Sequence, residues 1–354
     1  MDTIQSLGYN VYFNDSLTEL VNFIQQGKYS KVFILSDDQT SNCCLPAVTE
    51  RLDGVTPYDL IEISSGEANK TIDFCIGVWK MLIDFGADRH SLLINVGGGV
   101  VTDLGGFVAS TFKRGFDFVN VPTTLLSQVD ASVGGKTGVD LDSIKNIIGT
   151  FTQPKAVFVH PGFLETLPER QVRSGLAEML KHGLIDDEAY WDELKNSDLS
   201  VPNPELVFKS VVIKNKIVLD DPLEKGRRKC LNFGHTIGHA VETFSLDNDG
   251  DHLTHGEAIA IGMICEGWLS VQKAGLKQEE LEEIISVLTR VYPKYHLDDS
   301  CYTVLNSLMK KDKKNEGDNI NCTLISKIGA CAINQICTED ELCESLKFYA
   351  SLNF

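Results

Sequence analysis

The chain has 354 residues and a formal net charge of −18; 43% of its residues are hydrophobic and 23% are charged. This length predicts about two domains. We find neither an apolar run of the roughly 20 residues that span a membrane nor a leader peptide after Met1, so we expect a cytoplasmic protein. The negative charge argues against nucleic-acid and membrane partners, because their phosphate groups would be repelled.

The first half of the chain alternates predicted strands with helical patterns, of which the clearest covers residues 70–85. Strands are expected at residues 31–35, 58–63, 92–96, 118–121 and 156–159. Such alternation predicts an α/β domain with a mainly parallel sheet and helices on both faces.

Three glycines, Gly97 to Gly99, join the strand at 92–96 to a helical stretch. Glycines at such a turn let a phosphate group approach backbone N–H groups at a helix N-terminus, where the helix dipole favours negative charge. A glycine turn alone is a weak signal for a nucleotide. It gains weight here because motifs rich in charge and glycine follow it.

Polar groups crowd the segment from Arg114 to Asn146. The Gly-Gly-Lys-Thr stretch around Lys136 resembles a P-loop, but Asp130 stands where that pattern needs a glycine. A single lysine is usually a solvated surface charge. The glycine pair beside Lys136 and the asparagine after Lys145 instead favour loops that wrap an anionic ligand.

The pattern changes at residues 161–168, which include two prolines. Helices are predicted beyond them at 170–184, 204–219, 235–244, 256–274 and 279–291, with a small hairpin at 321–336. We therefore expect an α/β nucleotide-binding domain over 1–162 and a mainly helical domain over 163–354, with a cleft where they meet. The ten cysteines contain no C-x-x-C pair and are expected to be reduced and mostly buried.

Two further motifs carry candidate metal ligands. Glu178 and Lys181 lie one helical turn apart, a spacing that a plain ion pair would also explain. Four of the eight histidines fall close together: His235, His239, His252 and His255. A catalytic zinc site takes three protein ligands and keeps one position open. One glutamate and two of these histidines would supply that set, but the pattern leaves open which two.

Five segments occur in a fixed order: GGGVVTDLGGFVAS, RGFDFVNVPTTLLSQVDASVGGKTGV, KNIIGTF, GLAEMLKHGLI and LNFGHTIGHAVE. Together they resemble the 3-dehydroquinate synthase family of the shikimate pathway, which leads to chorismate and the aromatic amino acids. The resemblance implies a Rossmann-like N-terminal domain and a mainly α-helical, metal-binding C-terminal domain. It also implies NAD, one divalent metal (zinc or cobalt) and a homodimer.

Matched motif to motif, the resemblance makes Glu178, His235 and His255 the metal ligands and places His239 toward the substrate. The implied NAD contacts are Asp37, Glu67, Lys70, Gly98, Gly99, Asp103, Thr123, Thr124 and Thr166, together with Asp130, Lys136 and Lys145. The implied substrate contacts are Asp130, Lys136, Lys145, Asn146, Lys181, Lys214, Arg228, Asn232, His239 and Lys313 or its neighbour Lys314. Arg114 is expected to reach the substrate phosphate in the other subunit.

The family's reaction converts 3-deoxy-D-arabino-heptulosonate 7-phosphate to 3-dehydroquinate and phosphate, which makes the enzyme a lyase. NAD removes a hydride from C5 while the metal polarises neighbouring oxygens, and phosphate then leaves by β-elimination. NADH returns the hydride, the ring opens, and an intramolecular aldol reaction closes the carbocycle. Lysines and Arg228 would hold the two anionic ends of the substrate.

Alternative functions share part of this pattern. Another sugar-phosphate cyclase, of the 2-deoxy-scyllo-inosose or valiolone type, would act on a substrate without the carboxylate, whereas Arg228, Asn232 and His239 resemble a carboxylate-handling set. A metal-dependent polyol dehydrogenase would share the architecture but release NADH. A binding protein without catalytic activity would not need the candidate metal ligands, which are intact here. The stretch between His239 and His255 is longer than is usual in the family, which leaves His252 as a rival ligand.

Overall fold

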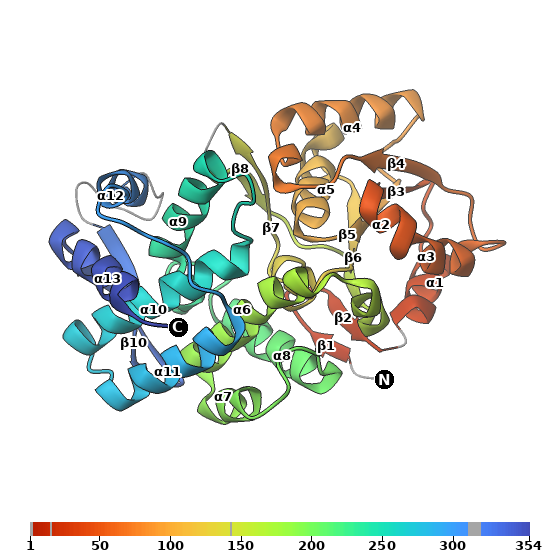
Figure 1. Cartoon of the computed structure of the whole chain (residues 1–354). Coiled ribbons are helices and arrows are strands. Elements are labelled where there is room, and N and C mark those ends of the chain that lie inside the picture. The colour runs from red at the N-terminus through yellow and green to blue at the C-terminus, as the bar shows by residue number, and fades with distance from the viewer. Residues whose placement is uncertain (1–2, 15, 142–143, 311–319) are drawn as a thin grey trace. The chain divides into compact units, whose positions relative to one another are not determined.

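The computed structural model describes residues 3–14, 16–141, 144–310 and 320–354 (Figure 1). The chain divides into two compact units, Met1–Pro168 and Glu169–Phe354. The division falls at the end of the proline-containing segment 161–168, where the sequence pattern changes.

A seven-stranded sheet in the order β1-β2-β9-β6-β5-β3-β4 forms the centre of the first unit. Its strands are β1 (Thr3–Gln5), β2 (Asn10–Phe13), β3 (Val32–Asp37), β4 (Asp59–Ile63), β5 (Leu92–Gly97), β6 (Asp117–Pro122) and β9 (Ala156–Val159). Neighbouring strands run parallel except β1 and β2. The five strands predicted from the sequence are all present, and the predicted parallel α/β fold is confirmed.

Helices cover both faces of this sheet because its strands are apolar on both sides. Along β3, Phe33 and Leu35 join a core cluster with α4 (Ile72–Asp84) and α5 (Gly99–Thr111). The intervening residues Val32 and Ile34 join a second cluster. That cluster includes α1 (Ser16–Gln26) and α3 (Leu45–Leu52), and α2 (Asp38–Cys43) precedes α3. Successive side chains of a strand point to opposite faces, so one strand supplies both cores.

The segment expected to form anion-wrapping loops contains instead an antiparallel hairpin, β7 (Lys136–Leu141) and β8 (Ile144–Phe151). Val139 of β7 packs into the same core cluster as α4 and α5. Glycines concealed the strand pattern. The two strands approach so closely that a Cβ at Gly149 would lie 2.2 Å from the Thr137 carbonyl oxygen.

The second unit is mainly helical, as predicted. Its helices are α6 (Glu169–Asp186), α7 (Glu188–Lys195), α8 (Pro204–Asp220), α9 (His235–Asn248), α10 (His255–Lys273), α11 (Gln278–Val291), α12 (Tyr302–Lys310) and α13 (Glu339–Ser351). The predicted hairpin is present as β10 (Ile320–Lys327) and β11 (Ala330–Cys337). Helix α10 packs against α6, α9 and α13. It is buried nearly all round between Gly256 and Ser270, as expected for a central helix.

A disulfide joins Cys230 and Cys331, whose Cα atoms are 5.9 Å apart. The expectation of reduced cysteines is therefore wrong for this pair. The two residues are 101 positions apart, and spacing alone could not have paired them.

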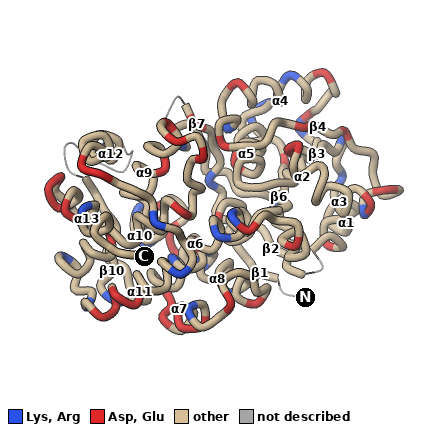
Figure 2. The backbone as a smooth tube through the Cα atoms, viewed as in Figure 1, with Lys and Arg blue, Asp and Glu red and all other residues tan. Residues whose placement is uncertain are grey.

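Acidic residues are frequent along α7 and α11 in the second unit (Figure 2). Within the described parts of the chain, no helix is long and apolar enough to cross a membrane.

Candidate functional site

The second unit brings together one carboxylate and two imidazoles from three helices. Glu178 of α6 is fully buried, and its Oε1 lies 3.5 Å from Nε2 of His235 and 3.5 Å from Nε2 of His255. One donor atom from each of the three residues lies within 4.8 Å of the others. A carboxylate oxygen and two imidazole nitrogens are a donor set that suits a divalent metal.

Both imidazoles are oriented through their other ring nitrogen. Nδ1 of His235 lies 3.1 Å from the carbonyl oxygen of Phe233, and Nδ1 of His255 lies 3.3 Å from Oε2 of Glu242. Each acceptor favours a proton on Nδ1, which leaves Nε2 as the ring nitrogen that can bind a metal once it is deprotonated. Sequence reasoning missed Glu242, although it lies within the LNFGHTIGHAVE motif, one helical turn after His239.

His239 lies beside this group, with its ring centroid 5.0 Å from that of His235 and 5.9 Å from that of His255. Together with Glu242 and His255 it forms a second arrangement of three donor atoms within 4.8 Å. The structure therefore brings His239 close to both histidines of the first group.

Direct contact between α6 and α10 places His255 near Glu178. A Cβ at Gly256 would lie 2.2 Å from the Ser174 carbonyl oxygen, so only glycine permits this approach. The Gly256 N–H donates to Ser174 Oγ at 3.1 Å. Ser174 precedes Glu178 by one helical turn, so the contact brings the start of α10 to the level of that carboxylate.

An arginine anchors the long loop that precedes His255. Arg170 donates to Glu257 at 2.9 Å, to Asp251 at 2.5 Å and to the His252 carbonyl oxygen at 2.8 Å. Glu257 also completes a capping box with Thr254 at the start of α10. The side chain of His252 is exposed and belongs to none of the donor groups found among the described residues. The extra residues of this loop, Asp251 and His252 among them, therefore lie at the surface of the second unit.

Three cationic side chains predicted to contact substrate are buried in this unit. Lys181 donates to Glu178 Oε2. Lys214 of α8 is 5% exposed. Arg228 is 1% exposed and donates from Nη1 to the Pro222 carbonyl oxygen at 2.8 Å. Buried cations are costly unless they are paired or serve an anion.

Asn232 ends the same short helix as Arg228, residues Arg227–Asn232, and donates to Glu224 at 2.7 Å. This helix ends shortly before His235, and Cys230 within it forms the disulfide to β11. Lys313 lies outside the described residues.

In the first unit, several predicted NAD contacts lie where parallel strands end. Asp37 ends β3, Gly98 caps the start of α5, and Gly99 is the first residue of α5. Thr123 and Thr124 follow β6, whose last residue pairs with Gly97. The carboxyl edge of such a sheet is where nucleotides bind in this architecture.

A charged network next to this edge joins residues predicted for both NAD and substrate. Lys70 is buried and donates to Asp103 Oδ2 and to Asn146 Oδ1, both at 2.6 Å. Lys145 lies 3.5 Å from Glu67 Oε1. Burial lowers the pKa of Lys70, but the carboxylate of Asp103 and its acidic neighbours raise that pKa above its usual value, so Lys70 stays charged.

The remaining predicted residues lie in separate segments of the first unit. Asp130 is in a helical turn at Ser127–Ala131, Lys136 is exposed at the start of β7, and Thr166 ends a short helix. Arg114 is exposed at the end of a turn and has a φ of 71°. The structure does not assign a ligand to these side chains.

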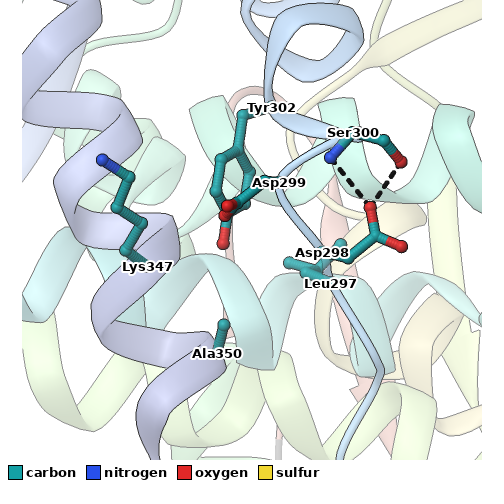
Figure 3. A pocket seen from close by; sticks show the side chains of 7 residues that line it. All are labelled: Leu297, Asp298, Asp299, Ser300, Tyr302, Lys347 and Ala350. Carbon is teal, nitrogen blue, oxygen red and sulfur yellow. Dashed lines mark hydrogen bonds between the residues drawn. The ribbon is translucent and has the colours of Figure 1, made fainter.

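A pocket elsewhere in the second unit contains none of the predicted residues. Its lining comes from the segment before α12, from Tyr302 at the start of α12 and from α13 (Figure 3). Asp298 accepts hydrogen bonds from the backbone and side chain of Ser300, and Lys347 pairs with Glu344 of its own helix. These charged groups already have local partners, and we assign the pocket no role.

Solved structures with a similar fold include sugar-phosphate cyclases and dehydrogenases. A 2-deoxy-scyllo-inosose synthase complexed with carbaglucose-6-phosphate, NAD+ and Co2+ has a TM-score of 0.85 at 24% identity, covering 98% of this chain and 99% of that one. A 2-epi-5-epi-valiolone synthase from Streptomyces hygroscopicus, with NAD+ and Zn2+ bound, has a TM-score of 0.84 at 25% identity over 99% of both chains. A probable glycerol dehydrogenase from Sinorhizobium meliloti has a TM-score of 0.66 at 15% identity, covering 96% of each chain. The fold is shared with all three and is more similar to the two sugar-phosphate cyclases than to the dehydrogenase.

Sequence comparison is more specific. Residues 60–174 match the 3-dehydroquinate synthase N-terminal family, and residues 175–315 match the 3-dehydroquinate synthase C-terminal family. A 3-dehydroquinate synthase from Parabacteroides distasonis is 42% identical over 343 residues, covering 96% of this chain and 97% of that protein. The chain belongs to the 3-dehydroquinate synthase family.

Proposed function

We propose that this chain converts 3-deoxy-D-arabino-heptulosonate 7-phosphate to 3-dehydroquinate and phosphate in the shikimate pathway. The observation that carries the proposal is the donor group of Glu178, His235 and His255, found in a member of this family beside Lys181, a buried cation. Family membership points to the reaction, and the three donor atoms provide a site for the metal ion that this reaction requires.

The three donors fit one divalent metal. Two imidazole nitrogens and one carboxylate oxygen suit both zinc and cobalt, and three protein ligands keep a coordination position open. We propose that Glu178, His235 and His255 are the ligands. The loop anchored by Arg170 supports His255 over His252, because the capping box fixes His255 at the start of α10.

NAD would bind at the carboxyl edge of the parallel sheet in the first unit. Gly98 and Gly99 begin α5, whose N-terminal N–H groups favour the pyrophosphate. When bound, NAD accepts and returns a hydride and the metal polarises substrate oxygens. Both related cyclases with bound ligands carry NAD+ together with Co2+ or Zn2+.

The chain's own residues would bind and orient the two anionic ends of the substrate. Arg228 suits the carboxylate, because a guanidinium forms two parallel hydrogen bonds. We propose that Lys181 and Lys214 add positive charge and that Asn232 and His239 complete the contacts in the second unit. The contacts proposed in the first unit are Asp130, Lys136, Lys145 and Asn146, with Arg114 serving the other subunit. Fixed groups in a dry site need little reorganisation as protons move.

We further propose a homodimer located in the cytoplasm. Arg114 is exposed, so its guanidinium is accessible to a second subunit, as the proposed dimer requires.

The test offers 3-deoxy-D-arabino-heptulosonate 7-phosphate, glucose 6-phosphate and sedoheptulose 7-phosphate to protein loaded with NAD and Zn2+ or Co2+, and follows phosphate release. We expect release from the first compound only, and only when NAD and metal are both present. Comparable turnover of either other sugar phosphate would assign the chain to a neighbouring cyclase class.

A further inference from the structure

Glu266 of α10 is a fully buried carboxylate at the N-terminus of another helix, α9. Its Oε2 accepts from the Gly234 N–H at 2.7 Å. Its Oε1 accepts from the N–H groups of Thr236 at 3.0 Å and Ile237 at 3.2 Å. These three donors flank His235, the first residue of α9.

The sequence of α9 explains why this acceptor has to come from another helix. The first N–H groups of a helix have no partner within it, and an N-cap side chain usually supplies one. Here the N-cap is Gly234, with a φ of 79° and no side chain. A Cβ at this position would lie 2.6 Å from Cγ of Met263. Glu266 replaces the missing cap, and its charge also interacts favourably with the dipole of α9.

The same helix pair holds two proposed metal ligands. Helix α10 begins with His255 and carries Glu266 further along, while α9 begins with His235. The backbones touch between these points, because a Cβ at Gly262 would lie 1.9 Å from the Gly234 carbonyl oxygen. Glu266 therefore fixes the start of α9 on the helix that also bears the other imidazole.

We propose that Glu266 is a positioning residue for the metal site: it holds the start of α9 so that His235 lies beside Glu178 and His255. This inference rests on the metal-ligand set given under the proposed function. Glu266 acts through the backbone of α9 and is not itself a ligand. A metal site of defined geometry depends on such supporting contacts.

The test compares Glu266→Gln with wild type by titrating metal-free protein with Zn2+ and Co2+ against a competing chelator, and by recording the Co2+ absorption spectrum. Glutamine keeps the shape and one acceptor oxygen, but its NH2 group would face the Gly234 N–H. We expect metal affinity to fall by about 10- to 100-fold and the Co2+ spectrum to change. Glu283→Gln is the matched control. Glu283 is also a hydrogen-bonded carboxylate, but its donor is Nε1 of Trp191, at a distance of 2.6 Å, and not the backbone of α9. Glu283→Gln should bind metal as the wild type does.

A folded Glu266→Gln protein with wild-type metal affinity and an unchanged Co2+ spectrum would overturn the inference, even if its unfolding free energy fell. His235→Ala tests the ligand set separately. If His235→Ala kept a full equivalent of metal, the ligand assignment would fail; if it lost metal while Glu266→Gln bound normally, only the role of Glu266 would fail.

If Glu266→Gln does not fold, Glu266→Asp is measured in the same way, since it keeps the charge but shortens the reach. Weakened metal binding in folded Glu266→Asp protein would support the proposal, and wild-type binding would overturn it. Failure of both variants to fold would also overturn it, because the whole unit rather than the metal site would then depend on this carboxylate.

Discussion

His255 has a carboxylate on each side of its ring, Glu178 facing Nε2 at 3.5 Å and Glu242 facing Nδ1 at 3.3 Å. Burial alone would lower the pKa of this histidine, but the charges of Glu242 and Glu178 raise it to about 9. The metal-free protein therefore holds a proton on His255 at neutral pH. A metal binds the neutral imidazole, so that proton must leave first.

Metal affinity should consequently rise with pH. While His255 is mostly protonated, its neutral, metal-binding fraction rises about tenfold for each pH unit. The metal affinity should therefore climb from pH 7 and level off near the pKa of about 9. Chelator-competition titrations at several pH values measure this. In Glu242→Gln the His255 pKa falls, and the rise should end at a lower pH. A flat profile between pH 7 and 9 in the wild type would contradict the assignment.

Arg228 provides a second prediction at this scale. Its guanidinium is buried and held by the Pro222 carbonyl oxygen, so it is pre-oriented for an anion. Charge-assisted hydrogen bonds contribute about 1.5–3 kcal/mol each, so Arg228→Ala should lower kcat/KM at least about tenfold, and Arg228→Lys should recover only part of the loss.

Arg227→Ala is the matched control for Arg228, since Arg227 lies on the same short helix but pairs with Asp186 and Asp220. Its kcat/KM should stay close to that of the wild type. Wild-type kcat/KM in a folded, metal-loaded Arg228→Ala protein would remove Arg228 from the substrate site.

At this scale the sequence pointed to Glu178, His235 and His255 only through family motifs, because spacing could not choose among four histidines. The structure adds the reason for their proximity, which lies in contacts between helices. Glu242 could have been noticed from its spacing to His239. Glu266 could not, because its partners are backbone N–H groups 29 to 32 residues away.

Among the elements, α9 and α10 carry two of the proposed metal ligands and touch each other directly. Gly262→Ala would place a Cβ 1.9 Å from the Gly234 carbonyl oxygen, and that backbone atom cannot move without shifting α9. We expect it to lower the free energy of unfolding by about 1–3 kcal/mol or more and to weaken metal binding. Urea denaturation and Co2+ titration measure the two effects.

Gly250→Ala is the control for this substitution, because nothing lies within 4 Å of a Cβ there. Its free energy of unfolding should stay within about 0.5 kcal/mol of the wild type. If both alanine variants matched the wild type in unfolding and in metal binding, close packing of α9 on α10 would not determine the site.

Long elements were predictable because their apolar spacing is regular. The five predicted strands, β3 to β6 and β9, and the helices α6 and α8 to α11 all appear where the sequence placed them. Shorter elements escaped for different reasons: glycines concealed β7 and β8, and α7 is only 8 residues long. Helix α13 begins with a capping box from Thr338 to Glu341, a local signal that the sequence did contain.

For the whole molecule, the net charge of −18 opposes an anionic substrate, so binding depends on local cations. We propose that one of them, Arg114, acts in the other subunit. Mixing inactive Arg114→Ala chains with inactive Lys181→Ala chains should then restore part of the activity through hybrid dimers. If no activity returned although subunit exchange had been demonstrated, the shared site would be excluded.

In the proposed reaction NAD acts as a catalyst that is reduced and reoxidised within each turnover. The most direct measurement loads the metal-bound protein with one equivalent of NAD, removes excess cofactor, adds an excess of 3-deoxy-D-arabino-heptulosonate 7-phosphate, and records phosphate together with absorbance from NADH. We expect many equivalents of phosphate for each NAD and no accumulated NADH. Phosphate release that stopped after one equivalent, with NADH formed in equal amount, would show instead that NAD is consumed as a stoichiometric oxidant; NADH formed without phosphate release would indicate a dehydrogenase.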